Sequence, residues 1–128
     1  MKYEIFLSER KTYLQILVNE PVTSELLKDF IGETARKAYE FRIDNFLFDL
    51  RCAPDQAEVT DHYVMVYKRS PKLGFKFRSK HAMLVSQKDM DDYSFVESIL
   101  INAGYQSKTF TDELSAIEWL EKDTPVPN

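Results

Sequence analysis

Residues 45–51 read Asn-Phe-Leu-Phe-Asp-Leu-Arg, and this short run is apolar on both of the faces that a strand would have. That composition is typical of a central strand in a sheet that is covered on at least one side. A longer amphipathic segment precedes it, with apolar residues repeating at helical spacing. Its stripe consists of Leu26, Leu27, Phe30, Ile31, Thr34, Ala38 and Phe41. Together, the amphipathic segment and the apolar run that follows it indicate a helix packed against a sheet.

Two more strands are predicted on the N-terminal side of that helix. Tyr3–Leu7 alternates between apolar and polar residues, and Thr12–Val18 is a second run rich in β-forming residues. The polar residues 8–11 between them predict a hairpin turn. Thr23 or Ser24 can cap the helix that follows.

A second helix is predicted directly after the central strand. Asp55 is its expected N-cap, and Ser70-Pro71 with Gly74 are expected to end it. Its expected inward residues are Val59, Tyr63, Val66 and Tyr67. They repeat at i, i+4, i+7 and i+8, which is the spacing of one helix face.

The next strand and helix have clear boundaries. His81–Val85 predicts another short buried strand. Asp91 and Asp92 then place negative charge at the positive end of a third helix. Gly104 follows the apolar face of that helix, at a position that favours a residue with positive φ.

Lys108–Phe110 predicts a last strand, and Thr111 is the expected cap of a final helix. The order is therefore β-β-α-β-α-β-α-β-α. Strands that alternate with helices predict an α/β domain with a mixed, mostly parallel sheet and right-handed crossovers. We expect one domain over residues 1–123. Residues 124–128, which contain two prolines, are expected to form a flexible tail.

Length and composition narrow the class of protein. The 128 residues suit one domain, and 44% hydrophobic with 30% charged residues is an ordinary globular balance. Cys52 is the single cysteine, so no intrachain disulfide can form. The first residues lack the apolar segment of a signal peptide, and no apolar run approaches the roughly 18 residues that span a bilayer. A reducing cytoplasm is the expected compartment.

The usual signatures of cofactor binding are missing from the sequence. With three glycines there is neither a G-x-G-x-x-G fingerprint nor a phosphate-binding loop. The spacing of His62, His81 and Cys52 does not suit zinc. We therefore expect no cofactor, no metal and no enzymatic activity.

Three motifs together resemble the SpoIIAA-like proteins of the STAS superfamily, whose fold is also likened to the Sec14 lipid-binding domain. Phe48–Arg51 is similar to the "DLRG"-type end of a family strand. The spacing from Phe95-Val96 through Gly104 to Phe110 is a second point of similarity. Phe110–Leu120 resembles the family ending "F-x-[DS]-x-x-x-A-x-x-W-L". None of these motifs is catalytic.

The resemblance covers Tyr3 to about Glu121 and implies a non-enzymatic bacterial module that binds partner proteins, or in some members small or lipidic ligands. Family antagonists are switched by phosphorylation of a serine in a D-S-x-G motif that opens the second helix. Here residues 54–61 read Pro-Asp-Gln-Ala-Glu-Val-Thr-Asp and contain no serine. Thr60 is the nearest hydroxyl and is expected inside the helix, so we expect the module to lack the phosphoserine switch.

Four candidate ligand-binding residues follow the central strand: Asp49, Arg51, Cys52 and Asp55. Ligands gather at the carboxyl ends of strands in α/β sheets, and Arg51 can bind an anion there. Alternatively, Arg51 pairs with a carboxylate while Asp55 caps a helix. We favour this structural interpretation, although a small-ligand site would be sought here first.

Cys52 has two interpretations as well. A nearby helix N-terminus can lower the pKa of a thiol, but a catalytic thiol also needs a base and an orienting group. Nothing in the sequence places His62 or His81 near the sulfur. We expect a small, partly buried loop residue.

Charge is unevenly distributed along the chain. The net charge is −4, yet residues 62–88 contain seven bases and no acid. Six of these bases form a candidate patch for an anionic partner: Lys68, Arg69, Lys72, Lys76, Arg78 and Lys80. The alternating residues 75–78 predict an edge strand or an extended loop. A phospholipid head group or an acidic protein would suit the patch, and a solvated loop is the simpler interpretation.

Two function hypotheses follow, with an enzyme that uses Cys52 as a distant third. The first is a protein-interaction or regulatory module, with Ile101 on the outer side of its helix as a candidate homodimer contact. The second is a small-ligand or lipid-binding module with an apolar pocket between sheet and helices. Nucleic acid is not an expected partner, because the whole chain is acidic and contains no known binding module.

Overall fold

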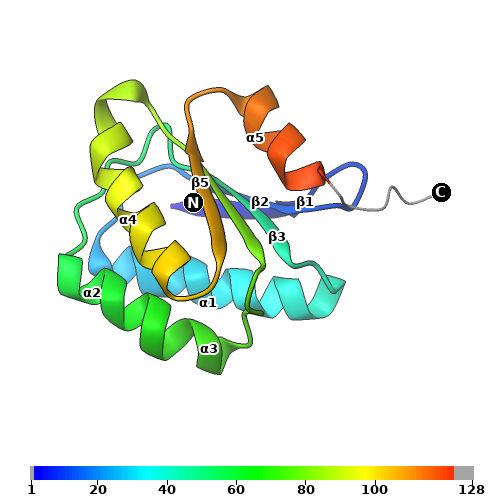
Figure 1. The fold of residues 1–128 in the computed structure, drawn as a ribbon, viewed down its shortest axis with the longest axis horizontal. Helices are drawn as coiled ribbons and strands as arrows, with labels where there is room; N and C mark the ends of the chain where they lie inside the picture. The colour runs from blue at the N-terminus through cyan, green and yellow to red at the C-terminus, as the bar shows by residue number, and fades with distance from the viewer. Residues whose placement is uncertain (1, 123–128) are drawn as a thin grey trace.

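Five strands form one sheet in the order β1-β2-β3-β4-β5 in a computed structural model that describes residues 2–122 (Figure 1). The strands are β1 (Tyr3–Leu7), β2 (Leu14–Val18), β3 (Asn45–Asp49), β4 (Lys80–Leu84) and β5 (Gln106–Phe110). β1 is antiparallel to β2, and every later pair is parallel. This confirms the predicted order and the mixed, mostly parallel sheet. The predicted boundary at residue 123 and the tail 124–128 lie outside the described residues.

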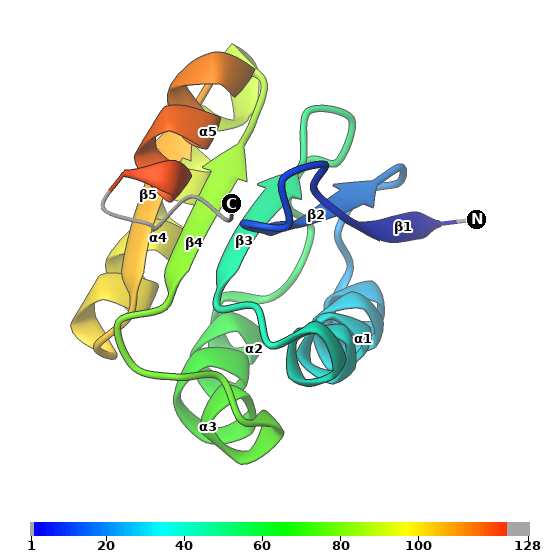
Figure 2. The same cartoon turned by 90° about the vertical axis from the view of Figure 1, so that its right-hand side faces the viewer.

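The helices cover the two faces of the sheet unequally (Figures 1 and 2). One face is covered by α1 (Ser24–Phe41), α4 (Met90–Asn102) and a helical arm between β3 and β4. The arm consists of α2 (Val59–Val64), the π-helical turn η1 (Met65–Arg69) and α3 (Ser70–Leu73). The other face is covered by α5 (Glu113–Glu121), which contacts β3, β4 and β5.

Alternation along β3 divides the core between these two faces. Phe46 and Phe48 join the larger cluster beneath α1, the arm and α4, while Leu47 joins the smaller cluster beneath α5. All three side chains are almost fully buried. β3 is thus the central strand, covered on both sides, that its composition indicated.

The arm differs from its prediction at both ends. α2 begins at Val59 with Glu58 as its N-cap residue, so Asp55 lies outside the helix and does not cap it. Pro71 does not end the helical segment either. It occupies the first turn of α3, which continues directly from η1, and Gly74 ends the segment with φ 95°.

Among the other predicted helix caps, two are confirmed and one is wrong. The backbone N–H of Leu26 donates to Oγ1 of Thr23, and Gly104 has φ 102°. Thr111, however, does not cap α5. The cap is Asp112, whose carboxylate accepts a hydrogen bond of 2.9 Å from the backbone N–H of Ser115. None of the helices within residues 2–122 has the length and apolar character needed to cross a membrane.

Candidate functional site

At the carboxyl end of β3, Arg51 is held by Asp49. Nε and Nη2 of Arg51 donate to the two carboxylate oxygens of Asp49 at 3.0 and 2.8 Å. These hydrogen bonds raise the pKa of Arg51 above its usual value. A second carboxylate, that of Glu113, lies 4.0 Å from Nη2 of Arg51. Two carboxylates therefore balance the positive charge of Arg51. The structural interpretation had expected Arg51 to pair with a carboxylate.

Asp55 has a different partner from the one expected. Nε2 of His62 lies 2.9 and 3.0 Å from the two oxygens of the Asp55 carboxylate, and both side chains are almost fully buried. Nearby, the hydroxyl of Tyr93 donates to the backbone carbonyl of Ala53, and burial raises the pKa of this phenol. These contacts join the loop after β3 to α2 and α4. Sequence reasoning missed His62 because seven residues separate it from Asp55.

Cys52 is exposed, rather than partly buried as expected. In the sequence it follows Arg51 and precedes Asp55. Because His62 is turned toward Asp55, its imidazole is occupied by that carboxylate. The four predicted site residues thus form two separate pairs and one exposed thiol.

The predicted basic patch is also divided. Lys68, Arg69 and Lys72 are exposed on the arm. Lys80 instead donates to the backbone carbonyls of Trp119 and Lys122 at the end of α5, at 2.9 and 2.8 Å. The remaining bases, Lys76 and Arg78, lie in a loop that forms no strand.

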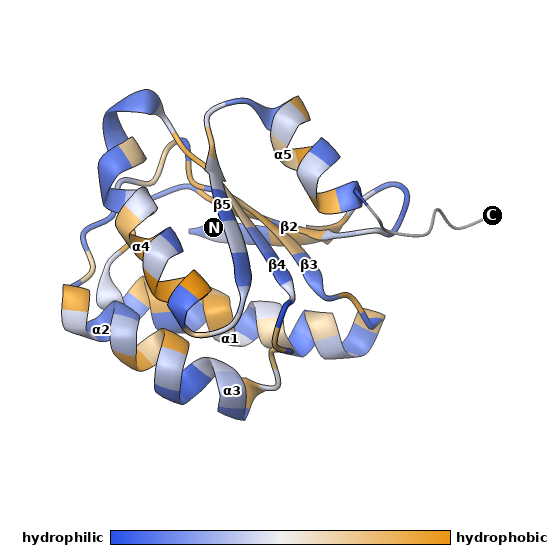
Figure 3. Cartoon of the chain, in the orientation of Figure 1, coloured by the Kyte–Doolittle hydropathy of each residue, from blue (hydrophilic) through white to orange (hydrophobic). Residues whose placement is uncertain are grey.

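The outer side of the arm carries an aromatic surface that the sequence did not predict. Val59, Tyr63 and Tyr67 were expected to face inward, yet each is about half exposed. Val66, the fourth residue expected to face inward, is buried, and the other buried residues of the arm are His62, Met65 and Ser70. Figure 3 shows apolar residues along the ribbons of α2 and α4.

We call Val59, Tyr63, Tyr67 and Phe95 the aromatic face. The Tyr63 ring stacks on that of Tyr67 at 6.2 Å and meets that of Phe95 edge-on at 6.4 Å. Val59 and Phe95 border a shallow groove of about 200 Å³ between α2 and α4. Ile101, the candidate homodimer contact, is half exposed on α4.

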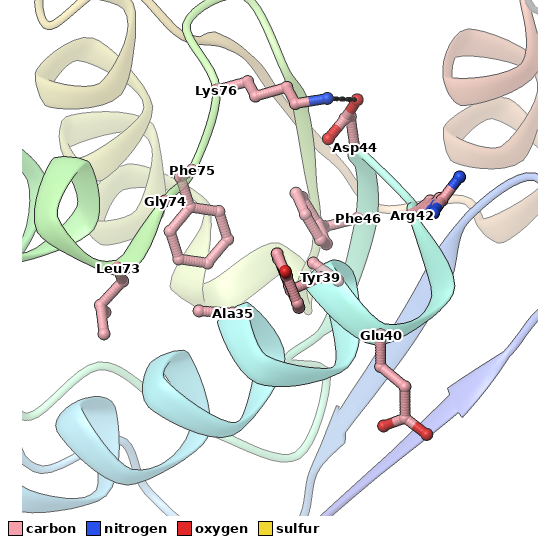
Figure 4. Close-up of a pocket in the computed structure, with 11 residues that line it drawn as sticks. Ala35, Tyr39, Glu40, Arg42, Asp44, Phe46, Leu73, Gly74, Phe75 and Lys76 are labelled. Carbon is pink, nitrogen blue, oxygen red and sulfur yellow. Dashed lines mark hydrogen bonds and ion pairs between the residues drawn. The ribbon is translucent and has the colours of Figure 1, made fainter.

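Two further pockets lie on the face covered by α1 and the arm. One is an apolar space of about 70 Å³ between sheet and helices, bordered by Leu27, Met65 and His81. Burial lowers the pKa of His81 to about 3, so this imidazole is neutral. The other, of about 530 Å³, opens at the amino ends of β3 and β4 (Figure 4). This larger pocket was not predicted, because its walls come from segments about 30 residues apart in the sequence.

No cluster of His, Cys, Asp and Glu side chains within residues 2–122 could hold a metal ion.

Among solved structures, the chain is similar to the crystal structure of an uncharacterized protein from the DUF3478 family with a SpoIIAA-like fold from Shewanella loihica PV-4. The two chains are 17% identical, the match covers 92% of this chain and 91% of that chain, and the TM-score is 0.63. No family model and no curated protein matches the chain. The likeness shows that the chain has a SpoIIAA-like fold, which confirms the fold that its motifs resembled.

Proposed function

We propose that the chain is a non-enzymatic protein-interaction module of the SpoIIAA-like type, and that its docking surface is the aromatic face. The observation that supports this proposal most strongly is the set of half-exposed, mutually packed rings of Tyr63, Tyr67 and Phe95. Tyrosine is enriched among the residues that dominate binding energy at protein interfaces. A contiguous apolar surface of this kind is also typical of interaction sites.

Asp91 and Asp92 line the groove beside Phe95, whereas the end of the arm beyond Tyr67 is basic and favours an acidic partner. Lys68, Arg69 and Lys72 are exposed on the same arm as the aromatic face, in a stretch of the chain that contains no acid. Opposite charges around an apolar centre accelerate association and select among partners. We therefore expect a partner protein with apolar residues flanked by Asp or Glu, acting in the cytoplasm.

Site-specific photo-crosslinking in the source cells tests this proposal. The photoreactive residue p-benzoylphenylalanine replaces Tyr67 in one variant and Leu114 in the control. Leu114 is 70% exposed on α5, on the opposite face of the sheet. We expect a protein adduct from position 67 only, and a weaker adduct when Lys68 and Arg69 are both changed to Glu. An adduct with a second copy of this chain would show a homodimer instead, and equal adducts at both positions would refute the docking surface.

A second candidate function is binding of a small apolar ligand. The observation that favours it is the apolar pocket of about 70 Å³ between sheet and helices. This space holds on the order of a few water molecules, so a lipid chain would require the arm to move away from the sheet. A native mass spectrum of the gently purified protein tests this candidate. A non-covalent added mass would support it, and a bare chain would count against it.

A further inference from the structure

The pocket at the amino edge of the sheet is built by three segments that are distant in sequence. α1 contributes Ala35 and Tyr39 near its C-terminal end, β3 contributes Phe46, and the loop after α3 contributes Gly74 and Phe75. Its volume of about 530 Å³ lies in the range of small-molecule sites. It is separate from the aromatic face and lies at the opposite end of the sheet from Asp49 and Arg51. We refer to it as the amino-edge pocket.

The inner surface of this pocket is aromatic. The Phe46 and Phe75 rings meet edge-on at 5.4 Å, and both are buried, so their positions are fixed by the core. Tyr39 lies beside them in Figure 4 and is 89% exposed. A ring of this size gains little by remaining in water, whereas a planar ligand packed between Tyr39 and Phe75 would cover it.

The charged groups of the pocket lie at its rim. Nζ of Lys76 is 3.3 Å from a carboxylate oxygen of Asp44, and both side chains are largely exposed. Arg42 is also at the rim, and within residues 2–122 its guanidinium has no ion-pair partner. In Figure 4 the side chains of Glu40 and Arg42 both point away from the aromatic rings. The formal charges of the lining balance, with Glu40 and Asp44 against Arg42 and Lys76. The wall formed by residues 73–76 belongs to the acid-free stretch of the chain, so Lys76 is the group on this wall that can pair with an anion.

We infer that the amino-edge pocket binds a small organic anion with a planar apolar body. The body packs against Tyr39, Phe46 and Phe75, and the anionic group pairs with Lys76. Asp44 holds Lys76 when the pocket is empty, and its carboxylate opposes the incoming anion. Removal of the Asp44 charge therefore strengthens binding of an anion. The same removal would weaken binding of a cation.

A pair of probes with one ring system and opposite charges tests the inference: 2-naphthoate and 2-naphthylmethylammonium. Each is titrated into the full chain while amide resonances are followed by NMR. We expect saturable shifts at Gly74 and Lys76 with 2-naphthoate, at concentrations about tenfold lower than any shifts with the ammonium probe.

Three variants test the contacts. Lys76→Gln weakens 2-naphthoate binding about threefold, and Asp44→Asn strengthens it by a similar factor, as expected for exposed charges. Lys88→Gln is the matched control, since Lys88 is an exposed base of the same stretch that follows β4 at the other end of the sheet. It leaves the affinity unchanged.

Several results would overturn the inference. A preference for the ammonium probe, or weaker anion binding by Asp44→Asn, would assign the pocket to cations. Shifts confined to Leu27 and Met65 would place the probe in the smaller apolar pocket instead. An equal effect of Lys88→Gln and Lys76→Gln would show that the affinity depends only on the net charge of the protein. If neither probe gave a saturable shift, the pocket would not be a binding site for such ligands.

Discussion

Among residues 2–122, three non-glycine residues have a positive φ, and all three are basic: Lys11, Arg42 and Arg78. A left-handed conformation costs an L residue roughly 1 kcal/mol. Arg42 adopts it at the end of α1, where its backbone N–H donates to the carbonyl of Ala38. Glycine is the usual residue at such a helix end.

Replacement of Arg42 by glycine should therefore stabilise the protein. We expect Arg42→Gly to raise the free energy of unfolding by about 0.5 kcal/mol, since the relief of strain exceeds the added freedom of the unfolded chain. The same substitution at Lys28, an exposed residue inside α1, should lower it by about 1 kcal/mol. Urea denaturation measures both. Similar losses for the two variants would show that Arg42 is not strained.

His81 makes stability depend on pH. Its ring is buried among Phe46, Phe48, Phe75 and Tyr105, and one ring nitrogen lies 2.8 Å from Oγ of Ser79. With the pKa lowered to about 3 in the folded state, the unfolded state binds the proton first as pH falls below 6.5. Stability is therefore lost as pH falls, and it rises with pH through this window.

The expected loss from His81 between pH 6.5 and pH 5 is about 1.5 kcal/mol. Most carboxylates titrate below this range, so the effect can be separated from theirs. We expect His81→Phe to have a flatter dependence of unfolding free energy on pH over the same range, whatever its absolute stability. Parallel curves for the two proteins would show that His81 is accessible to protons in the folded state.

At the scale of single elements, the helix caps can be tested in pairs. Thr23→Ala removes the acceptor of the Leu26 N–H and should destabilise the protein by about 1 kcal/mol. Thr111→Ala should change stability by less than about 0.5 kcal/mol, because Asp112 caps α5. Thermal unfolding of both variants distinguishes the two residues. A large effect at Thr111 would mean that α5 begins one residue earlier than the structure shows.

The arm shows where sequence patterns were insufficient. Val59, Tyr63 and Tyr67 repeat at the spacing of one helix face, but the sheet covers the neighbouring face that contains Met65 and Val66. Periodicity identifies an apolar stripe and does not say whether the sheet or a partner covers it. The turn η1 is π-helical, with i→i+5 backbone hydrogen bonds, and no sequence pattern predicted it.

At the scale of the whole molecule, the fold was predictable because it depends on local patterns. Each strand and helix has its own periodicity, and the rules for parallel sheets then limit how they connect. The candidate sites were less predictable, since they depend on contacts between distant segments. A carboxylate partner for Arg51 was anticipated, and it is Asp49, two residues away, whereas the contact between Asp55 and His62 and the amino-edge pocket were not anticipated.

Hydrogen exchange should reflect the same architecture. We expect the amides of β3 and β4, which are buried between two layers of helices, to exchange most slowly. The amides of residues 59–73 should exchange on the order of 100-fold faster, because the arm contains a π-helical turn and a four-residue helix. Mass spectrometry of peptic fragments measures this. Equal protection in the two regions would show that the arm opens only with the whole domain.

The strand order of the sheet matches the order of synthesis. On a ribosome, each new strand from β2 to β5 can add to the growing edge of a sheet that already exists, so no strand has to be inserted between two others. The face that contains Leu47, Leu84 and Phe110 stays uncovered until α5 emerges, since α5 covers it. A nascent chain is thus vulnerable to aggregation until α5 leaves the exit tunnel.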